Sequence, residues 1–306
     1  MRALLRGESA RREALVLLPG LLAFAVFLLW GAVDGGYPPT LWYPGALFLL
    51  ALAVVMFASG RLGAGGSRPA RLALALLAAF ALWSFLSIAW ANVQGDAWDG
   101  ANRTLLYLLV YALFALWPWR PMGAAGLLFL LSGGIALAGA ATFAQAATSS
   151  DPAPFFTSGR FSEPVGYVNA NTALFLIAFW PAIFLAARRE VPVLGRGLAL
   201  ASAGTLLELA LLTQSRGSLF AFPAVLALFL LLVPGRVRSL TALLPALGAL
   251  LLARRPLLDV FRVVESGEAR DELVSARNAI ALTALGLFLL GVGLAWLDLR
   301  VRSPGA

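Results

Sequence analysis

The sequence predicts an all-α protein that crosses a membrane as a bundle of helices, and its composition is the main reason. Hydrophobic residues make up 61% of the 306 residues, charged residues make up 12%, and the mean hydropathy is +0.87. A typical soluble domain is about 45–50% apolar and about 25% charged. One water-exposed fold cannot bury this much apolar surface, so we expect the lipid bilayer to surround the protein.

Apolar runs of roughly 20 residues, the length of a membrane-spanning helix, recur along the whole chain. We expect a single transmembrane domain over residues 1–306. The first run has no small-residue cleavage site after it, so it reads as a retained helix rather than a signal peptide. Because the runs at 218–233 and 239–253 are short, the number of spans lies between about nine and eleven. The ten predicted spans are 14–33, 41–59, 71–92, 102–118, 122–144, 172–188, 196–213, 218–233, 239–253 and 276–298.

The arginines between these runs predict the orientation. If the N-terminus is cytoplasmic, arginines outnumber acids in the inner segments, while acids outnumber arginines in the outer ones. This distribution satisfies the positive-inside rule with both termini in the cytoplasm. The Gly- and Ser-rich stretch 59–70 then becomes a flexible cytoplasmic connector, and the longer outer loops are expected near 145–171, 213–217 and 254–275.

The residue types that are absent exclude several chemistries. The chain has no cysteine, no histidine and no lysine, so all 23 basic residues are arginines. Most zinc and haem sites and a histidine general base are therefore excluded, and we expect no metal and no cofactor. The net charge of +8 does not predict nucleic-acid binding, because the arginines lie in short loops between apolar runs. Biased codon usage or phosphate binding would each explain a preference for arginine.

Two polar segments interrupt the apolar pattern, and the shorter one is Thr213–Gly217. It places Arg216, beside Ser215, at a membrane boundary, where an ionisable residue is a functional hypothesis by default. Glu208 lies inside the preceding span, about 12 Å along the helix axis from Arg216. Glu208 has two interpretations: a polar clamp between helices, or a carboxylate that orients an arginine or acts as a base.

The longer polar segment runs from Gly159 to Asn171 and begins with Arg160. A loop of this length is often functional. Its Tyr167, Asn169 and Asn171 offer neutral donors and acceptors that suit sugar hydroxyls. Under the alternative interpretation, the loop is a turn whose asparagines cap the next helix.

At these residues the chain resembles the O-antigen ligase / O-antigen polymerase family of bacterial membrane proteins. Three stretches carry the resemblance: the Arg160–Asn171 loop before an apolar run, Leu211–Gly217 before the next run, and Ser87–Leu105 with Trp90, Asp96 and Trp98. Together with the pattern of spans, they cover nearly the whole chain.

The resemblance implies a function at the outer face of the bacterial cytoplasmic membrane. Members of this family take a glycan from an undecaprenyl-diphosphate carrier and pass it to a glycan, lipid or protein acceptor, without a metal or nucleotide. Arg216 matches the family's Ser-Arg-Gly arginine and Arg160 matches an arginine of the preceding outer loop, so both are expected to hold the diphosphate. Fixed guanidinium groups would also stabilise the charge that develops as the diphosphate leaves.

The chain differs from the family in one respect that bears on its function. Family members carry a large outer loop with a histidine that is the favoured base, whereas this chain has no histidine. We therefore expect the N-terminal part of a longer transferase or a truncated member; otherwise Glu208, Glu163 or an outer-loop acid must supply the base. The alternatives are a non-catalytic subunit that binds lipid-linked glycans, and a transporter or flippase.

Overall fold

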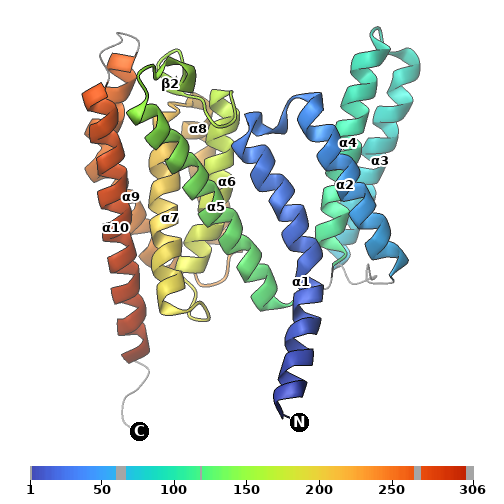
Figure 1. Cartoon of the computed structure of the whole chain (residues 1–306), viewed down its shortest axis with the longest axis horizontal. Helices are drawn as coiled ribbons and strands as arrows, with labels where there is room; N and C mark the ends of the chain where they lie inside the picture. Colours follow the sequence, from blue (N-terminus) through green and yellow to red (C-terminus); the bar gives the residue numbers. More distant parts are fainter. Residues whose placement is uncertain (1, 60–66, 118, 265–269, 301–306) are drawn as a thin grey trace. The chain divides into compact units, whose positions relative to one another are not determined.

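The computed structural model describes residues 2–59, 67–117, 119–264 and 270–300 (Figure 1). The prediction of an all-α protein is confirmed, and each predicted span overlaps one helix. The helices of the described chain are α1 (Arg2–Ala32), α2 (Pro39–Ala58), α3 (Arg68–Ser87), α4 (Gln94–Ala115), α5 (Pro121–Thr148), α6 (Val168–Ala186), α7 (Val193–Leu212), α8 (Arg216–Leu232), α9 (Arg236–Val263) and α10 (Arg270–Arg300).

The surface of these helices is suited to lipid. Within the described ranges, seven helices are long and apolar enough to cross a membrane: α2, α3, α5, α6, α7, α9 and α10. The second half of α1 and the whole of α8 are apolar but shorter. Large apolar side chains such as Phe57, Phe220 and Leu252 are more than 70% exposed, as suits helices in contact with lipid. The chain is therefore a membrane-embedded helical protein.

The chain divides into two compact units, where the sequence predicted a single domain. The first unit contains residues 1–26 and 38–124, and the second contains residues 27–37 and 125–306. In the first unit α3 packs against α4, and α4 also contacts α2. A polar contact joins α2 to α4, because the Tyr43 hydroxyl donates to Asp99 at 3.4 Å. Within α4, Asp99 also forms an ion pair with Arg103 at 3.0 Å.

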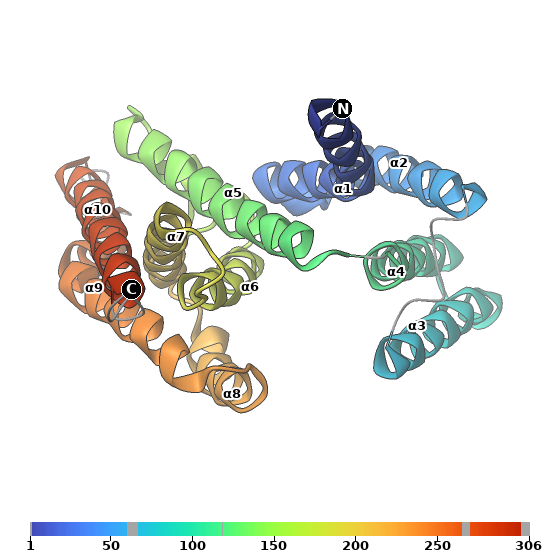
Figure 2. The same cartoon turned by 90° about the horizontal axis from the view of Figure 1, so that it is seen from below.

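In the second unit, α7 is the central helix. It packs against α6, α9 and α10, and Figure 2 shows α6 on one side of α7 with α9 and α10 on the other. The core between these helices is aromatic and aliphatic, with Phe175, Phe179, Leu206 and Leu209 fully buried. Because each helix satisfies its own backbone hydrogen bonds, such a core can lie at any depth of the bilayer.

Small residues bring α7 and α10 close together. A Cβ atom built on Gly291 would lie 2.8 Å from the Cα atom of Gly197 and 3.2 Å from the carbonyl oxygen of Arg196. Close packing of small residues is a common source of stability between helices in membranes, where burial of apolar surface contributes little.

Several predicted loops are helical in the structure. The expected outer loop 254–275 is wrong over its described part, because α9 continues to Val263 and α10 begins at Arg270. The mixed charges of this segment are typical of a loop, which is why the sequence does not predict the helix. Asp259 and Arg262 are nevertheless three residues apart on one helix face, and their side chains form an ion pair at 3.3 Å. Asp96 and Asp99, which precede the predicted span 102–118, also lie in the first turns of a helix, α4. The core of the 59–70 connector, residues 60–66, lies outside the described residues.

Candidate functional site

A small hairpin in the loop between α5 and α6 presents Arg160. Strand β1 (Phe156–Thr157) pairs antiparallel with β2 (Arg160–Phe161), so Thr157 lies opposite Arg160. Ser158 and Gly159 connect the strands with φ angles of 49° and 71°, as a two-residue type I′ turn requires. A Cβ atom on Gly159 would lie 3.1 Å from the carbonyl oxygen of Phe261, so the turn rests directly on α9.

The alternation of the short strand β2 fixes which way Arg160 faces. Phe161 is fully buried and packs against the rings of Phe143, Phe156 and Phe175. Successive residues of a strand point to opposite faces, so burying Phe161 turns the half-buried Arg160 away from this core. The position of the guanidinium therefore depends on an aromatic anchor next to it in the sequence.

The turn between α7 and α8 presents Arg216. Gln214, two residues after the end of α7, has a φ angle of 51°, and Arg216 is the first residue of α8. Two side-chain hydrogen bonds hold this turn against the start of α6: Thr213 pairs with Thr172, and the Ser215 hydroxyl donates to Oδ1 of Asn169 at 2.9 Å. The sequence predicts a loop at 213–217, whereas the structure has a turn at residues 213–215, and Arg216 and Gly217 already belong to α8.

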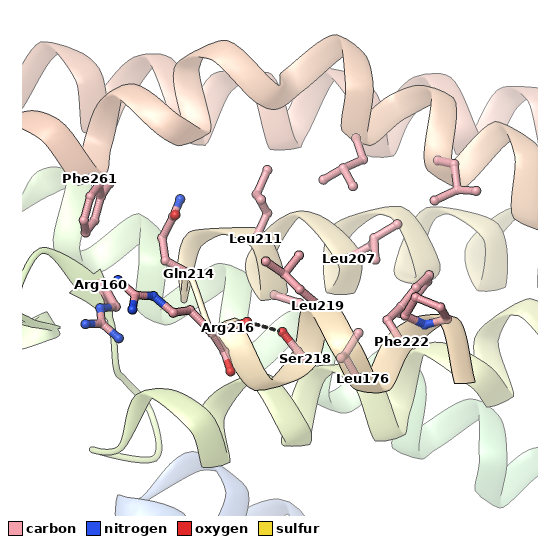
Figure 3. A pocket seen from close by; sticks show the side chains of 15 residues that line it. Arg160, Leu176, Leu207, Leu211, Gln214, Arg216, Ser218, Leu219, Phe222 and Phe261 are labelled. Carbon is pink, nitrogen blue, oxygen red and sulfur yellow. Dashed lines mark hydrogen bonds between the residues drawn. The ribbon is translucent and has the colours of Figure 1, made fainter. Parts of the chain in front are cut away.

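Both arginines line one cavity of about 660 Å³, an ordinary volume for a ligand site. Figure 3 shows Arg160 and Arg216 at one end of this cavity, near Gln214 and Phe261, with apolar side chains along the rest. The apolar lining comes from α6, α7, α8 and α9: Leu176, Leu207, Ala210, Leu211, Leu219, Phe222, Pro223, Leu247 and Leu250. The cavity is therefore amphipathic, with a cationic end and a hydrocarbon end.

The cationic end has unused hydrogen-bond donors. Within the described chain, neither Arg160 nor Arg216 has an ion pair or a side-chain hydrogen bond. The buried Nε2 atom of Gln214 likewise has no hydrogen-bond partner among the described residues. Arg216 also lies at the N-terminus of α8, where the helix dipole favours an anion. Two free guanidinium groups and a free amide donor suit a ligand with several anionic oxygens.

The structure gives the neutral residues predicted to bind substrate two different environments. Tyr167 and Asn169 are exposed, and Nδ2 of Asn169 donates to the Tyr167 hydroxyl at 3.0 Å. Asn171 is fully buried, and its Nδ2 atom donates to the backbone oxygen of Glu163 at 2.7 Å. Neither asparagine caps α6, since the N-cap residue is Tyr167 and makes no side-chain capping bond. Asn171 shapes the loop, whereas Asn169 and Tyr167 remain accessible.

The structure does not bring Glu208 to an arginine. Its side chain is fully buried, and Oε2 accepts a hydrogen bond from the Thr283 hydroxyl of α10 at 3.0 Å. Among the described residues, Oε1 has no partner. The two turns of helix between Glu208 and Arg216 leave the carboxylate facing α10 rather than the cavity. The predicted role of orienting an arginine is therefore not what the geometry provides, and the clamp between helices describes it better.

Glu163 and Asp34 form an acidic pair near the loop. Burial raises the pKa of the Glu163 carboxyl above its ordinary value of 4.5, and the negative charge of Asp34 raises this pKa further. Asp34 begins the short helix η1 (Asp34–Gly36), and a Cβ atom on the next residue, Gly35, would lie 2.7 Å from Cγ1 of Val165. Neither carboxylate lines the cavity.

Some lining residues were not predicted from the sequence. Gln214 lies in the same polar segment as Arg216, and the sequence signal for it is an amide side chain between a spanning helix and Ser215. Phe261, Leu247 and Leu250 come from α9, and nothing local in an apolar or charged run indicates which residues face a cavity. In the described part of the chain, no three acidic side chains lie close enough to hold a metal ion.

No family model, curated protein or solved structure matches this chain. Fold and site together define a class: a membrane-embedded α-helical protein with an amphipathic, cationic cavity.

Proposed function

We propose that the cavity binds a polyprenyl-diphosphate-linked glycan, as the resemblance to O-antigen ligases and polymerases implies. The observation that carries this proposal is the amphipathic lining: two arginines that have no ion pair among the described residues at one end, and leucine and phenylalanine side chains along the rest. Arginine binds phosphate oxygens through paired, charge-assisted hydrogen bonds. A lipid diphosphate has both parts that this lining complements, an oxygen-rich anionic head and a hydrocarbon chain.

The proposed orientation places this site at the outer face of the bacterial cytoplasmic membrane, with ten spans and both termini in the cytoplasm. The excess of arginine in the inner segments supports it. The chain has no native cysteine, so a single cysteine can report its side of the membrane. In intact cells, an impermeant maleimide should label Ser149→Cys in the α5–α6 loop and should not label Ser59→Cys after α2.

Glycan transfer is the proposed use of the bound carrier. An acceptor hydroxyl oxygen would attack the anomeric carbon, the bond from that carbon to the diphosphate oxygen would break, and the diphosphate would leave with the electron pair. Arg160 and Arg216 would stabilise the departing charge. The hydroxyl proton must pass to a base, and the cavity lining offers neither a histidine nor a carboxylate.

The missing base favours a second candidate function, binding of the carrier without turnover. A subunit of this kind would hold the lipid-linked glycan for a partner that supplies the base. Incubating the purified protein with carrier and acceptor separates the two candidates. Release of free polyprenyl diphosphate would support transfer, whereas stable binding without release would support the subunit.

Equilibrium binding of undecaprenyl diphosphate to the protein in nanodiscs tests the shared claim. Charge-assisted hydrogen bonds contribute about 1.5–3 kcal/mol each, so Arg216→Ala should weaken binding roughly tenfold to a hundredfold. Undecaprenol, which lacks the diphosphate, should bind more weakly and should not distinguish the variant from the native chain.

Arg262→Ala is the matched control for loss of a nearby arginine. Arg262 is exposed on α9, pairs with Asp259 at 3.3 Å and does not line the cavity. Its removal should leave the diphosphate affinity within about twofold, or roughly 0.4 kcal/mol. If Arg216→Ala and Arg262→Ala weaken diphosphate binding equally, the effect comes from the overall surface charge and the proposal is contradicted.

A further inference from the structure

A second cavity of about 500 Å³ lies on the other side of the first turns of α8. It shares the side chains of Leu176, Ser215, Ser218 and Phe222 with the cationic cavity, so these residues form a wall between the two spaces. Its remaining lining comes from α6 and α8: Asn169, Thr172, Ala173, Ile177, Trp180, Gly217, Ala221 and Val225. We call this space the α6–α8 groove.

The α6–α8 groove is amphipathic, yet no residue that lines it carries a charge. Its polar end consists of the Asn169 amide and the hydroxyls of Thr172, Ser215 and Ser218, while Ile177, Trp180 and Val225 line the apolar end. A lining without charge does not compensate for desolvating an ion, so a neutral ligand is favoured. Amide and hydroxyl groups both donate and accept, as the hydroxyls of a ligand require.

Asn169 has hydrogen-bonding capacity left over. Its Oδ1 atom accepts from Ser215 at 2.9 Å, and its Nδ2 atom donates to Tyr167 at 3.0 Å. An amide offers two N–H donors and two acceptor lone pairs, so one of each remains unused among the described contacts. Asn169 is exposed at the polar end of the groove, where a ligand can reach both.

Gly217 leaves space that the protein itself does not use. A Cβ atom on Gly217 would meet only Oγ of Ser215, at 3.9 Å, so packing within the described chain does not require a glycine. Glycine in a helix is less favourable than most residues. This glycine lines the groove next to Arg216, where a side chain would project into the free volume instead of into the protein.

The geometry points to the α6–α8 groove as a binding site for a neutral amphiphile with a hydroxyl-bearing headgroup, such as a glycolipid. Its headgroup would contact Asn169 and Ser215, and its chain would lie along Trp180 and Val225. The next step rests on the proposed function: this amphiphile is the acceptor of the glycan. Ser215 and Ser218 belong to the wall between the two spaces, so the hydroxyls of the amphiphile would lie next to the diphosphate cavity. Opposite faces of one helix turn would then hold the two substrates of a transfer.

Photolabelling of the full chain in nanodiscs tests this site. The probe is a long-chain alkyl glucoside with a photoreactive diazirine in its chain. Saturable labelling is expected on peptides that cover residues 173–180 and 217–225, with unlabelled alkyl glucoside competing and the alkanol of the same chain competing at least tenfold less well. Gly217→Leu should reduce this labelling at least tenfold, because the new side chain fills the groove.

Two further variants make the result specific. Gly286→Leu is the matched control, since Gly286 is exposed on α10 with nothing within 4 Å of its Cβ position, and it should label like the native chain. Arg216→Ala should also label normally, although it binds undecaprenyl diphosphate more weakly than the native chain. Full labelling in Gly217→Leu, or equal competition by the alkanol, would overturn the proposal. Specific labelling of the native chain, together with no binding of undecaprenyl diphosphate, would support this site and contradict the proposed function.

Discussion

Asn171 holds the loop that carries Arg160. Its Nδ2 atom donates to the backbone oxygen of Glu163 at 2.7 Å and, at 3.4 Å, to that of Phe161, the residue after Arg160. Asn171 itself is fully buried in the first turn of α6. One amide therefore joins a spanning helix to both ends of the segment behind the cationic end of the cavity.

Asn171→Ala should weaken undecaprenyl diphosphate binding although Asn171 does not line the cavity. The substitution leaves two carbonyl groups without their donor, which costs about 1–3 kcal/mol of stability, and it releases the loop that positions Arg160. Thermal unfolding and equilibrium binding, measured on the same sample, check both effects. Asn278→Ala on the exposed face of α10 is the control and should change neither. Unchanged binding in Asn171→Ala would show that the loop holds its shape without this amide.

The Glu163 carboxyl should make stability depend on pH. Because burial and then Asp34 raise its pKa in the folded state, the folded protein binds this proton more tightly than the unfolded chain does. Stability from this group is full below the ordinary pKa of 4.5 and is lost as pH rises through the raised pKa. Glu163→Gln should flatten this decline and raise the melting temperature at pH 7.

Melting curves between pH 4 and pH 8, followed by tryptophan fluorescence, test the Glu163 prediction. Asp34→Asn should remove only part of the decline, since burial is the larger cause and the Asp34 charge the smaller. The same slope in Glu163→Gln as in the native chain would assign the pH dependence to another group.

Glu208 should act on stability rather than on ligand binding. Its hydrogen bond to Thr283 joins α7 to α10 inside the bundle. Hydrogen bonds between membrane helices contribute about 0.6 kcal/mol on average and at most about 1.7, so a double-mutant cycle of Glu208→Ala and Thr283→Ala should give a coupling energy in this range. Glu208→Gln should bind undecaprenyl diphosphate normally. A tenfold loss of undecaprenyl diphosphate affinity in Glu208→Gln would show that the carboxylate takes part in ligand binding.

The contact between Gly197 and Gly291 should tolerate no side chain. A leucine at position 291 would collide with the backbone of α7, and overpacking of this kind costs about 1–3 kcal/mol. Gly293→Leu, two residues along the same helix, is the control, because nothing lies within 4 Å of its Cβ position. A clear drop in melting temperature for Gly291→Leu but not for Gly293→Leu is expected.

The helices and the Arg216 turn could be predicted because their signals are local. A run of roughly 20 apolar residues predicts a spanning helix wherever its neighbours lie. Each predicted span overlaps a helix, and a turn at residues 213–215 separates α7 from α8 within the predicted segment. The continuation of α9 past Arg254 is not predicted by hydropathy, because the segment is charged, although charged residues at helix spacing are compatible with a helix.

Partners in space could not be predicted in the same way. The sequence left two interpretations of Glu208 open, and only the structure shows that its partner is Thr283, 75 residues further along the chain. The α9 residues Leu247, Leu250 and Phe261 line the cavity, but their sequence pattern does not differ from that of lipid-facing neighbours. These choices depend on how helices rotate against one another, which one sequence does not encode locally.

The most direct test of the paired-arginine cavity is native mass spectrometry of the protein purified from a bacterial membrane that contains undecaprenyl diphosphate. The native chain should retain a lipid of that mass, and Arg160→Ala combined with Arg216→Ala should release it while Arg262→Ala keeps it. Retention of the lipid by the double variant, at the same occupancy as the native chain, would contradict the account.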